Sequence, residues 1–437
     1  MSLRRALGTF DATMIVVGGI IGGGIFINPA VVAERLPTAG LVLGAWAAGG
    51  AIALAGAFVF AELAAALPRA GGEYAYLREA YHPLVGFLFG WASLLLIQGG
   101  GIAAVAITFA RYALRLAGRP GAPSAPLAIG AIALLAGINV LGVKPGSRVL
   151  NTLVVLKIAA LATLVFGGLA FASHAPPAAG GGVLPRAGLF AFGGALVPIL
   201  FSYGGWQSAN LVAEETRNPR RTLPRALLAG TTIVILVYVS VNFVYLRALG
   251  RDGLAATATP AAEAVRRLMG SGADRFVAAA IAISTFGFLD LSFLAPTRIS
   301  YAMARDGLFP AALSRLHSRF QTPAAAIALQ AVWSSVLVAI GNYGGLIDSV
   351  VFADWIFFGL AAAAVFVLRR RAGGTPPGDQ FRAPGYPVLP ILFVAASVLA
   401  VASAVLSSPQ RSAVGVALLA AGIPVYFVYA RRLRRRT

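Results

Sequence analysis

The chain has 437 residues, of which 59% are hydrophobic and only 11% are charged. Its apolar runs repeatedly reach the roughly 20 residues that cross the hydrocarbon core of a bilayer, so the sequence predicts a polytopic membrane protein. Cysteine is absent, which excludes disulfides, thiolate metal sites and cysteine nucleophiles. The three histidines, His82, His174 and His317, each lie beside a predicted loop, and we expect neither a metal site nor a cofactor.

Twelve apolar segments predict twelve membrane-spanning helices in an all-α membrane protein. The first segment begins near Phe10 and is long enough to span, so we expect no cleavable signal peptide. The predicted spans are 11–36, 40–67, 84–115, 125–142, 148–172, 189–216, 224–247, 275–303, 322–341, 347–369, 386–406 and 412–431.

Basic residues set the predicted orientation. Roughly two-thirds of the Lys and Arg residues fall on the side of the two termini, which the positive-inside rule makes cytoplasmic. The net charge of +20 could also indicate binding to nucleic acid or anionic lipid. Because the arginines are spread over alternate short loops and the tail, topology is the favoured explanation, and no nucleic-acid partner is expected. The predicted location is the inner (plasma) membrane, with the lipid bilayer around the chain.

Two glycine runs interrupt two of the predicted spans: Gly22-Gly23-Gly24 in the first and Gly204-Gly205 in the sixth. Broken helix at bilayer depth is tolerated only where protein or a water-filled cavity satisfies the backbone. Breaks at equivalent places in two halves indicate a substrate site between the inverted repeats of a transporter. The alternative is that these glycines only let helices pack closely. We therefore predict a single transporter domain over 1–437, with repeats at 11–172 and 189–369 and two further helices at 386–431.

The breaks also suggest what they bind. One half of the first span would end near Ile20 with free carbonyls, and the other would start near Gly24 with free N–H groups and a positive dipole end. Such a site suits the ammonium and carboxylate groups of an α-amino acid. A side chain at Gly24 is expected to enter the space of the carboxylate.

Two segments outside the spans, 71–80 and 260–269, read as short amphipathic helices on opposite faces of the membrane. They suit gating elements, and they equally suit interfacial loop helices without a role in gating.

Several motifs in order resemble the amino acid–polyamine–organocation superfamily, most closely its L-type amino acid transporter branch and bacterial relatives. The resemblance covers nearly the whole chain. The residues that carry it are Ile20 to Phe26, Ala61 to Leu63, Pro68, Gly71, Gly72, Tyr74, Tyr76, Phe201 to Trp206, Glu214, Glu215, Asn218, Pro219, Arg298, Arg305 to Gly307, Thr322 and Pro323. It implies the LeuT-type fold, with ten core helices in two inverted repeats of five and two peripheral helices.

The same resemblance implies roles for individual residues. Gly22, Gly23 and Gly24 would hold the substrate carboxylate, and Phe201 would be the gate that closes over the substrate. The amine would be received by the carbonyls of Ile20, Phe201, Ser202 and Gly204. Tyr203 and Trp206 would either pack the unwound segment or touch the substrate. The chain departs from many relatives at Gly23, where they have serine, and at Gln207 and Ser208, which leaves the size of the substrate side chain open.

Charges inside the spans are functional candidates because they are costly in lipid. Lys157, in the fifth span, has no acidic residue in its own segment, and by resemblance its ammonium stands where sodium sits in sodium-coupled relatives. Asp290, in the eighth span, could pair with Lys157 or relay a proton. Asp11, Glu62 and Glu214 lie toward span ends, where capping or ion pairing is the expected role.

The predicted function is sodium-independent transport of amino acids, with neutral ones favoured, by exchange or with protons. The alternatives are a carrier of cationic amino acids or polyamines and a membrane sensor that binds without transport. An enzyme is disfavoured because no acid, base and nucleophile converge. Without cysteine, a disulfide-linked partner subunit, as eukaryotic L-type relatives have, is impossible.

Overall fold

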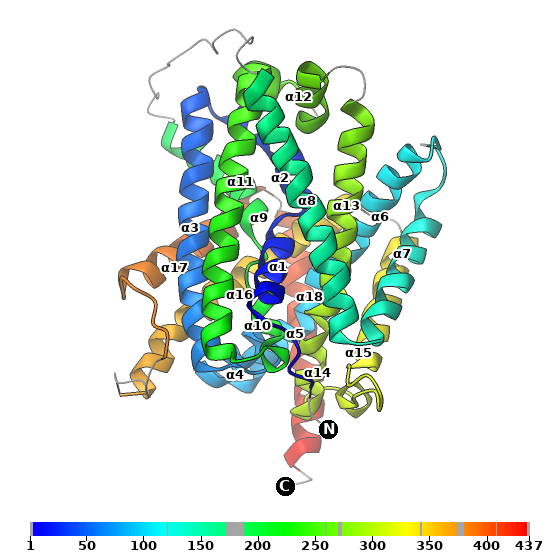
Figure 1. Ribbon diagram of the computed structural model, residues 1–437. Helices are drawn as coiled ribbons and strands as arrows, with labels where there is room; N and C mark the ends of the chain where they lie inside the picture. Colours follow the sequence, from blue (N-terminus) through cyan, green and yellow to red (C-terminus); the bar gives the residue numbers. More distant parts are fainter. Residues whose placement is uncertain are drawn as a thin grey trace.

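A computed structural model of the chain describes residues 3–119, 121–171, 188–257, 259–269, 273–340, 343–373, 380–407 and 409–434. Over these residues the protein is a bundle of helices with one isolated bridge between Leu7 and Thr216 (Figure 1). His174 lies outside the described residues.

The first half of the chain opens with a helix pair that covers the first predicted span. Thr38 caps the helix Ala39–Ala66, which follows this pair, by accepting from Leu41 N at 3.3 Å. His82 caps the helix that begins at Pro83. The elements are α1 (Thr9–Ile20), α2 (Gly24–Arg35), α3 (Ala39–Ala66), α4 (Glu73–Ala80), α5 (Pro83–Ala92), the π-helix η1 (Ser93–Gln98), α6 (Gly99–Leu116), α7 (Ser124–Val140) and α8 (Val143–Phe171).

The second half again starts with a broken segment. Pro296 separates two further helices that together cover the eighth predicted span. The elements are α9 (Gly188–Tyr203), α10 (Ser208–Leu211), η3 (Ala213–Glu215), α11 (Pro219–Ala255), α12 (Pro260–Met269), α13 (Ala273–Leu294), α14 (Thr297–Arg305), η4 (Ala311–Ser314), α15 (Ala324–Ile340), α16 (Tyr343–Arg371), α17 (Val388–Ser407) and α18 (Pro409–Arg434).

Within the described residues, seven helical segments are long and apolar enough to cross a membrane, and the bent pair α1 and α2 would make an eighth. Two shorter apolar helices, α7 and α15, cover the fourth and ninth predicted spans. An all-helical membrane protein is therefore confirmed. The full set of twelve spans and the five-plus-five inverted repeat remain predictions.

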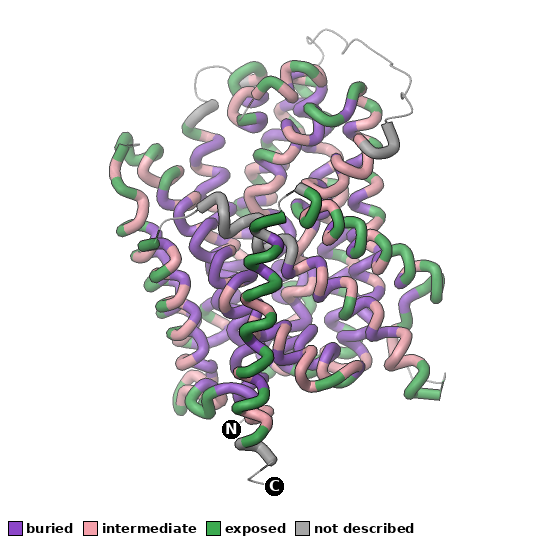
Figure 2. The backbone as a smooth tube through the Cα atoms, turned by 180° about the vertical axis from the view of Figure 1, so that it is seen from behind, coloured by how far each residue is buried: buried purple, intermediate pink, exposed green. Residues whose placement is uncertain are grey.

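Burial divides the bundle into a centre and a periphery. In the segment formed by α13 and α14, 78% of the most apolar window is buried, against 22% in α17 and 17% in α18. Figure 2 shows exposed positions along the outer helices and buried positions inside the bundle. Exposed apolar side chains such as Phe166, Leu236 and Leu406 cover outer surfaces that suit contact with lipid.

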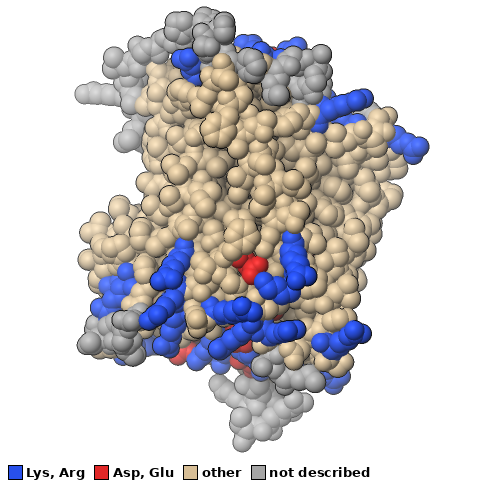
Figure 3. All heavy atoms as spheres, viewed as in Figure 1, with Lys and Arg blue, Asp and Glu red and all other residues tan. Residues whose placement is uncertain are grey.

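The two ends of the bundle are distinguishable. Both chain termini lie at one end together with α4 and α14, here called the termini end, and α12 lies at the opposite end (Figure 1). The two amphipathic segments are thus helices at opposite ends, as the sequence predicts. Lys and Arg side chains form a band near the termini end on the face shown in Figure 3.

The segment before α1 is tied to the end of the sixth predicted span. Ala6 N and Leu7 N donate to the Glu215 carbonyl at 2.9 and 3.0 Å, and Arg217 N donates to the Leu7 carbonyl at 2.9 Å. The backbone of the N-terminal segment therefore joins α1 to η3.

Candidate substrate site

The first glycine run breaks the helix where the sequence predicts. α1 ends at Ile20, α2 begins at Gly24, and their axes differ by 43°. Across the break, Gly22 N donates to the Ile20 carbonyl at 2.8 Å and Phe26 N donates to the Gly23 carbonyl at 3.1 Å. The regular ladder of helix hydrogen bonds is replaced by tight local turns, which frees backbone groups in the middle of the bundle.

The second glycine run ends α9 at Tyr203, and α10 starts only at Ser208. Gly205 has a φ of +113°, a conformation that side chains with a Cβ rarely adopt. Gly204 N donates to the Phe201 carbonyl at 3.2 Å, and Gly205 N donates to Gln207 Oε1 at 3.1 Å.

The two broken segments cross at Gly19 and Gly205. A Cβ on Gly205 would lie 2.2 Å from the Gly19 carbonyl oxygen, and one on Gly19 would lie 2.5 Å from the Gly205 carbonyl oxygen. Two residues without side chains are therefore needed for this backbone contact. The glycines therefore both interrupt the helices and let the two segments pack closely.

A tyrosine hydroxyl joins the two breaks. Tyr238 of α11 donates to the Ile20 carbonyl at 2.9 Å and lies 3.2 Å from the Ser202 carbonyl, with the geometry of a hydrogen bond to each. These are two of the carbonyls that the resemblance assigns to the substrate amine, so the structure brings them to one point. The Ile20 carbonyl also accepts from Gly22 N at 2.8 Å, so a substrate amine would have to take the place of one of its two present donors. Sequence reasoning missed Tyr238, because nothing marks it within the apolar run of its helix.

The three glycines of the first break differ in their surroundings. A Cβ on Gly23 would meet nothing within 4 Å, and one on Gly22 would only touch Phe288 at 3.9 Å. A Cβ on Gly24 would lie 2.6 Å from Ser202 Oγ, so a side chain there would first meet Ser202, and its entry into the carboxylate's space stays a prediction. Gly24 is small because α9 packs against it there.

Asn28 holds α2 against α9 beside this contact. Its Nδ2 donates to Ser202 Oγ at 2.7 Å and to the Pro198 carbonyl at 3.0 Å. Ser202 is buried, and its hydroxyl donates in turn to the Pro198 carbonyl at 2.8 Å. Asn28 was not among the predicted site residues.

A cavity of about 40 Å³ leads from Gly23 toward the α12 end of the bundle. It is bounded by α2, α6, α12 and α13, and its polar lining comes from Thr108, Tyr112, Arg115 and Thr259. The open position at the break therefore lines this cavity.

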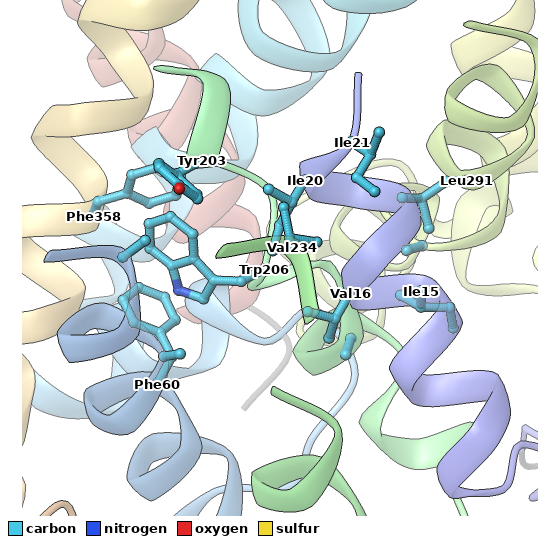
Figure 4. Close-up of a cluster of buried hydrophobic side chains, with 14 of the residues drawn as sticks. Ile15, Val16, Ile20, Ile21, Phe60, Tyr203, Trp206, Val234, Leu291 and Phe358 are labelled. Carbon is cyan, nitrogen blue, oxygen red and sulfur yellow. The ribbon is translucent and has the colours of Figure 1, made fainter. Parts of the chain in front are cut away.

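The aromatic residues of the sixth span separate into two kinds. Tyr203 and Trp206 are fully buried; Tyr203 lies 5.1 Å from Tyr238, and Trp206 lies 5.4 Å from Phe358 between ring centroids. Figure 4 shows them grouped with Phe60 and Phe358, which fits packing of the unwound segment. Phe201 is 42% exposed. Its role as a gate remains a prediction.

Lys157 of α8 reaches the first break. Its side chain is 1% exposed, and its Nζ donates to the Ile21 carbonyl. Ser284 Oγ of α13 lies 3.4 Å from the same carbonyl. The ammonium therefore stabilises the free carbonyl end of α1 and joins α8 to it, as a bound cation would.

Asp290 does not pair with Lys157. Its Oδ1 accepts from Asn139 Nδ2 of α7 at 2.7 Å, deep between α7 and α13, while Oδ2 has no hydrogen-bond partner in the described part of the chain. The structure thus brings Lys157 to the break and leaves Asp290 outside it.

The three acidic residues near span ends pair as expected. Asp11 accepts from Gly8 N at 2.9 Å and from Lys144 Nζ at 2.7 Å. Glu62 pairs with Arg369 at 2.6 Å, and Glu214 with Arg305 at 2.8 Å.

A fully buried ion pair closes the termini end. Arg298 of α14 makes two hydrogen bonds to Glu215, at 2.8 and 2.9 Å, and the two side chains are 0% and 1% exposed. Asp306, just beyond α14, accepts from Tyr74 Oη at 2.8 Å and from Arg78, both on α4. These contacts join α14 to η3 and α4 to the segment after α14, on the side of the molecule opposite the cavity.

Comparison with known proteins agrees with this geometry. The amino acid permease family profile matches residues 7–429. The serine/threonine exchanger SteT of Bacillus subtilis is 32% identical over 434 residues, which cover 98% of each chain. The human large neutral amino acids transporter small subunit 2 is 30% identical over 98% of this chain and 81% of its own. The mouse Asc-type amino acid transporter 1 is 28% identical over 98% and 82%.

Two glycine-broken helices that cross at the bundle centre, and a match along almost the whole length, identify the chain. It belongs to the amino acid permease family of the amino acid–polyamine–organocation superfamily, in the L-type branch, and is a membrane transporter and not an enzyme.

Proposed function

We propose that this protein exchanges neutral amino acids across the inner membrane without sodium. The observation that carries the proposal is the meeting of the two breaks, where the Ile20 and Ser202 carbonyls share one hydroxyl beside the open position at Gly23. Free N–H groups at the start of α2 would hold the carboxylate, and these carbonyls would receive the amine.

Sodium independence is supported by Lys157. Its ammonium already supplies a positive charge to the Ile21 carbonyl, so the break does not need a bound ion to neutralise it. Exchange, rather than net uptake, is supported by the relative named a serine/threonine exchanger. The same relative and the large neutral amino acid transporter make serine and threonine the first substrates to test.

The experiment is counterflow in proteoliposomes. Liposomes loaded with unlabelled serine are diluted into labelled serine, in sodium, potassium and choline buffers. We expect equal uptake in the three buffers and little uptake without internal amino acid. A strict sodium requirement would overturn the sodium-independent part, and binding without counterflow would point to a sensor.

Lys157→Ala tests the residue itself. We expect it to reduce counterflow at least tenfold while the protein still purifies as a monodisperse species, because the carbonyl end of α1 loses its cation. Lys144→Ala is the matched control, since Lys144 is the other lysine of the chain and pairs with Asp11 away from the break. A fully active Lys157→Ala protein would show that transport does not need the Lys157 ammonium, which would then have only a structural role.

A further inference from the structure

Glu73 of α4 and Asp354 of α16 lie on two helices that pack together, and neither carboxylate has an ion-pair partner within the described residues. Glu73, the first residue of α4, is 2% exposed, and its Oε1 has no hydrogen-bond partner within the described residues. Burial, and then the negative charge of Asp354 on α16, raise the pKa of Glu73 well above its ordinary range. A fully buried carboxylate beside a second, half-buried one is unfavourable when both are charged, so the site requires a positive species.

A third polar group faces the pair. The Tyr76 hydroxyl, three residues along α4 from Glu73, is fully buried and without a hydrogen-bond partner in the described structure. Burial, and then the charge of Glu73, raise the pKa of Tyr76, which places the two groups close enough to interact. Tyr76 keeps its own proton and cannot neutralise the carboxylates.

Five basic residues of the surrounding elements are engaged elsewhere, and Arg370, near the end of α16, is exposed. Arg78 of α4 pairs with Asp306, and Arg298 and Arg305 of α14 pair with Glu215 and Glu214. Arg369 of α16 pairs with Glu62 of α3, and Arg371 donates to the Glu79 carbonyl. On α6, Arg115 lines the cavity toward α12. α5, which packs on α4, carries no charged residue.

We propose that Glu73 and Asp354 together bind one proton when the termini end is closed, and that this proton leaves when α4 separates from α16. A metal ion fits the site poorly. Hard cations take about six or more oxygen ligands, and no group of three or more acidic or histidine side chains exists in the described part of the chain. The four residues after Asp354, from Trp355 to Phe358, are all apolar or aromatic and offer no such ligands.

The position of α4 connects this proton to transport, and this step rests on the proposed function. Tyr74 and Arg78, on either side of Tyr76, fasten α4 to Asp306 beyond α14. Closing the termini end therefore sets Glu73 against α16. Because the closed state raises the pKa of Glu73, protonation favours closure, and this contribution is lost as pH rises through the raised pKa.

The proton is tested directly by infrared difference spectra of the purified full-length protein between acid and alkaline pH. We expect a protonated-carboxyl band in the wild type that is lost in Glu73→Gln and in Asp354→Asn. Glu79→Gln is the matched control, because Glu79 is on the same helix but exposed, and it should keep the band. The same band in both site variants overturns the proposal, as does a band that responds to sodium at constant pH.

Serine counterflow at several pH values gives the functional consequence. One linked proton changes the population of the closed state by up to about tenfold per pH unit, so the wild-type rate should depend on pH. That dependence should disappear in both site variants and persist in Glu79→Gln. Absence of counterflow in every protein would refute the proposed function and leave the infrared result to decide on the proton. Equal pH dependence in wild type and site variants would overturn the coupling.

Discussion

Gly205 is the residue on which the crossing of the two broken helices depends most. Its φ of +113° is strained for any residue with a side chain, and a Cβ at this position would lie only 2.2 Å from the Gly19 carbonyl oxygen. Strain of the backbone alone costs roughly 1–3 kcal/mol for a residue other than glycine, and the contact with backbone cannot relax by a rotamer change.

We therefore expect Gly205→Ala to lower the thermal unfolding temperature in detergent and to abolish counterflow. Gly204→Ala is the control one residue away, where the nearest atom to a Cβ, the Phe201 carbonyl oxygen, is at 3.4 Å. If Gly205→Ala were as stable and active as Gly204→Ala, the crossing described above would be incorrect.

Gly23 provides the opposite case at the residue scale. A side chain there meets nothing within 4 Å and extends into the cavity instead of the protein. Gly23→Val should thus abolish serine binding, measured by ligand-induced thermal stabilisation, with little change in the unfolding temperature of the free protein. Gly44→Val, on the exposed face of α3 with equally open space, controls for the cost of valine in a helix. Unchanged serine binding in Gly23→Val would remove Gly23 from the site.

At the scale of elements, α14 is fixed to η3 by the buried pair of Arg298 and Glu215. Removing one partner leaves a buried charge uncompensated, which typically costs about 3–5 kcal/mol. Arg298→Met should therefore strongly destabilise the protein, and adding Glu215→Leu should restore part of the loss. Arg305→Met is the comparison, since its pair with Glu214 is 43% and 24% exposed and is worth at most about 1 kcal/mol. Equal unfolding temperatures for the two single variants would contradict this ranking.

Sequence patterns predicted the breaks but not how the elements meet. Glycine runs inside apolar segments indicate an interrupted helix, and the structure places breaks at both. The crossing of Gly19 with Gly205 could not be predicted, because Gly19 lies within the regular part of α1. Likewise, Lys157 was predictable as a charge in an apolar run, whereas its acceptor, the Ile21 carbonyl, is backbone and carries no sequence signal. Asp290 shows the converse: the eighth span was expected to carry it toward Lys157, and its partner is Asn139 of α7 instead.

For the whole molecule, orientation in the membrane is the prediction with the widest reach. Basic residues concentrate near the end of the bundle that holds both termini, so we expect that end to be cytoplasmic (Figure 3). A fluorescent protein fused after Thr437 should fold and fluoresce in cells, and a periplasmic phosphatase at the same place should be inactive. A phosphatase inserted in the loop before α12 should be active. The reverse pattern would place the α12 end of the bundle in the cytoplasm instead.

The helical architecture was the most predictable feature, because every helix that crosses a bilayer needs a long run of apolar residues. Helices lie over each of the predicted spans, and the segments after the second and seventh spans are short helices. Boundaries were less predictable where spans are interrupted: the eighth span divides at Pro296 into α13 and α14, and the third contains the π-helix η1. In both places, packing against neighbouring helices decides the local geometry.

The backbone join between the N-terminal segment and η3 has a mechanical consequence. Ala6, Leu7 and Arg217 each donate one backbone hydrogen bond across this join, and all three bonds must break before α1 and η3 can separate. We expect α1 and η3 to rotate together as one rigid unit, with Gly22 to Gly24 and Gly204 to Gly205 as its two hinges. The ion pair between Arg298 and Glu215 joins this unit to α14, so we expect its loss to release α1 and η3 together.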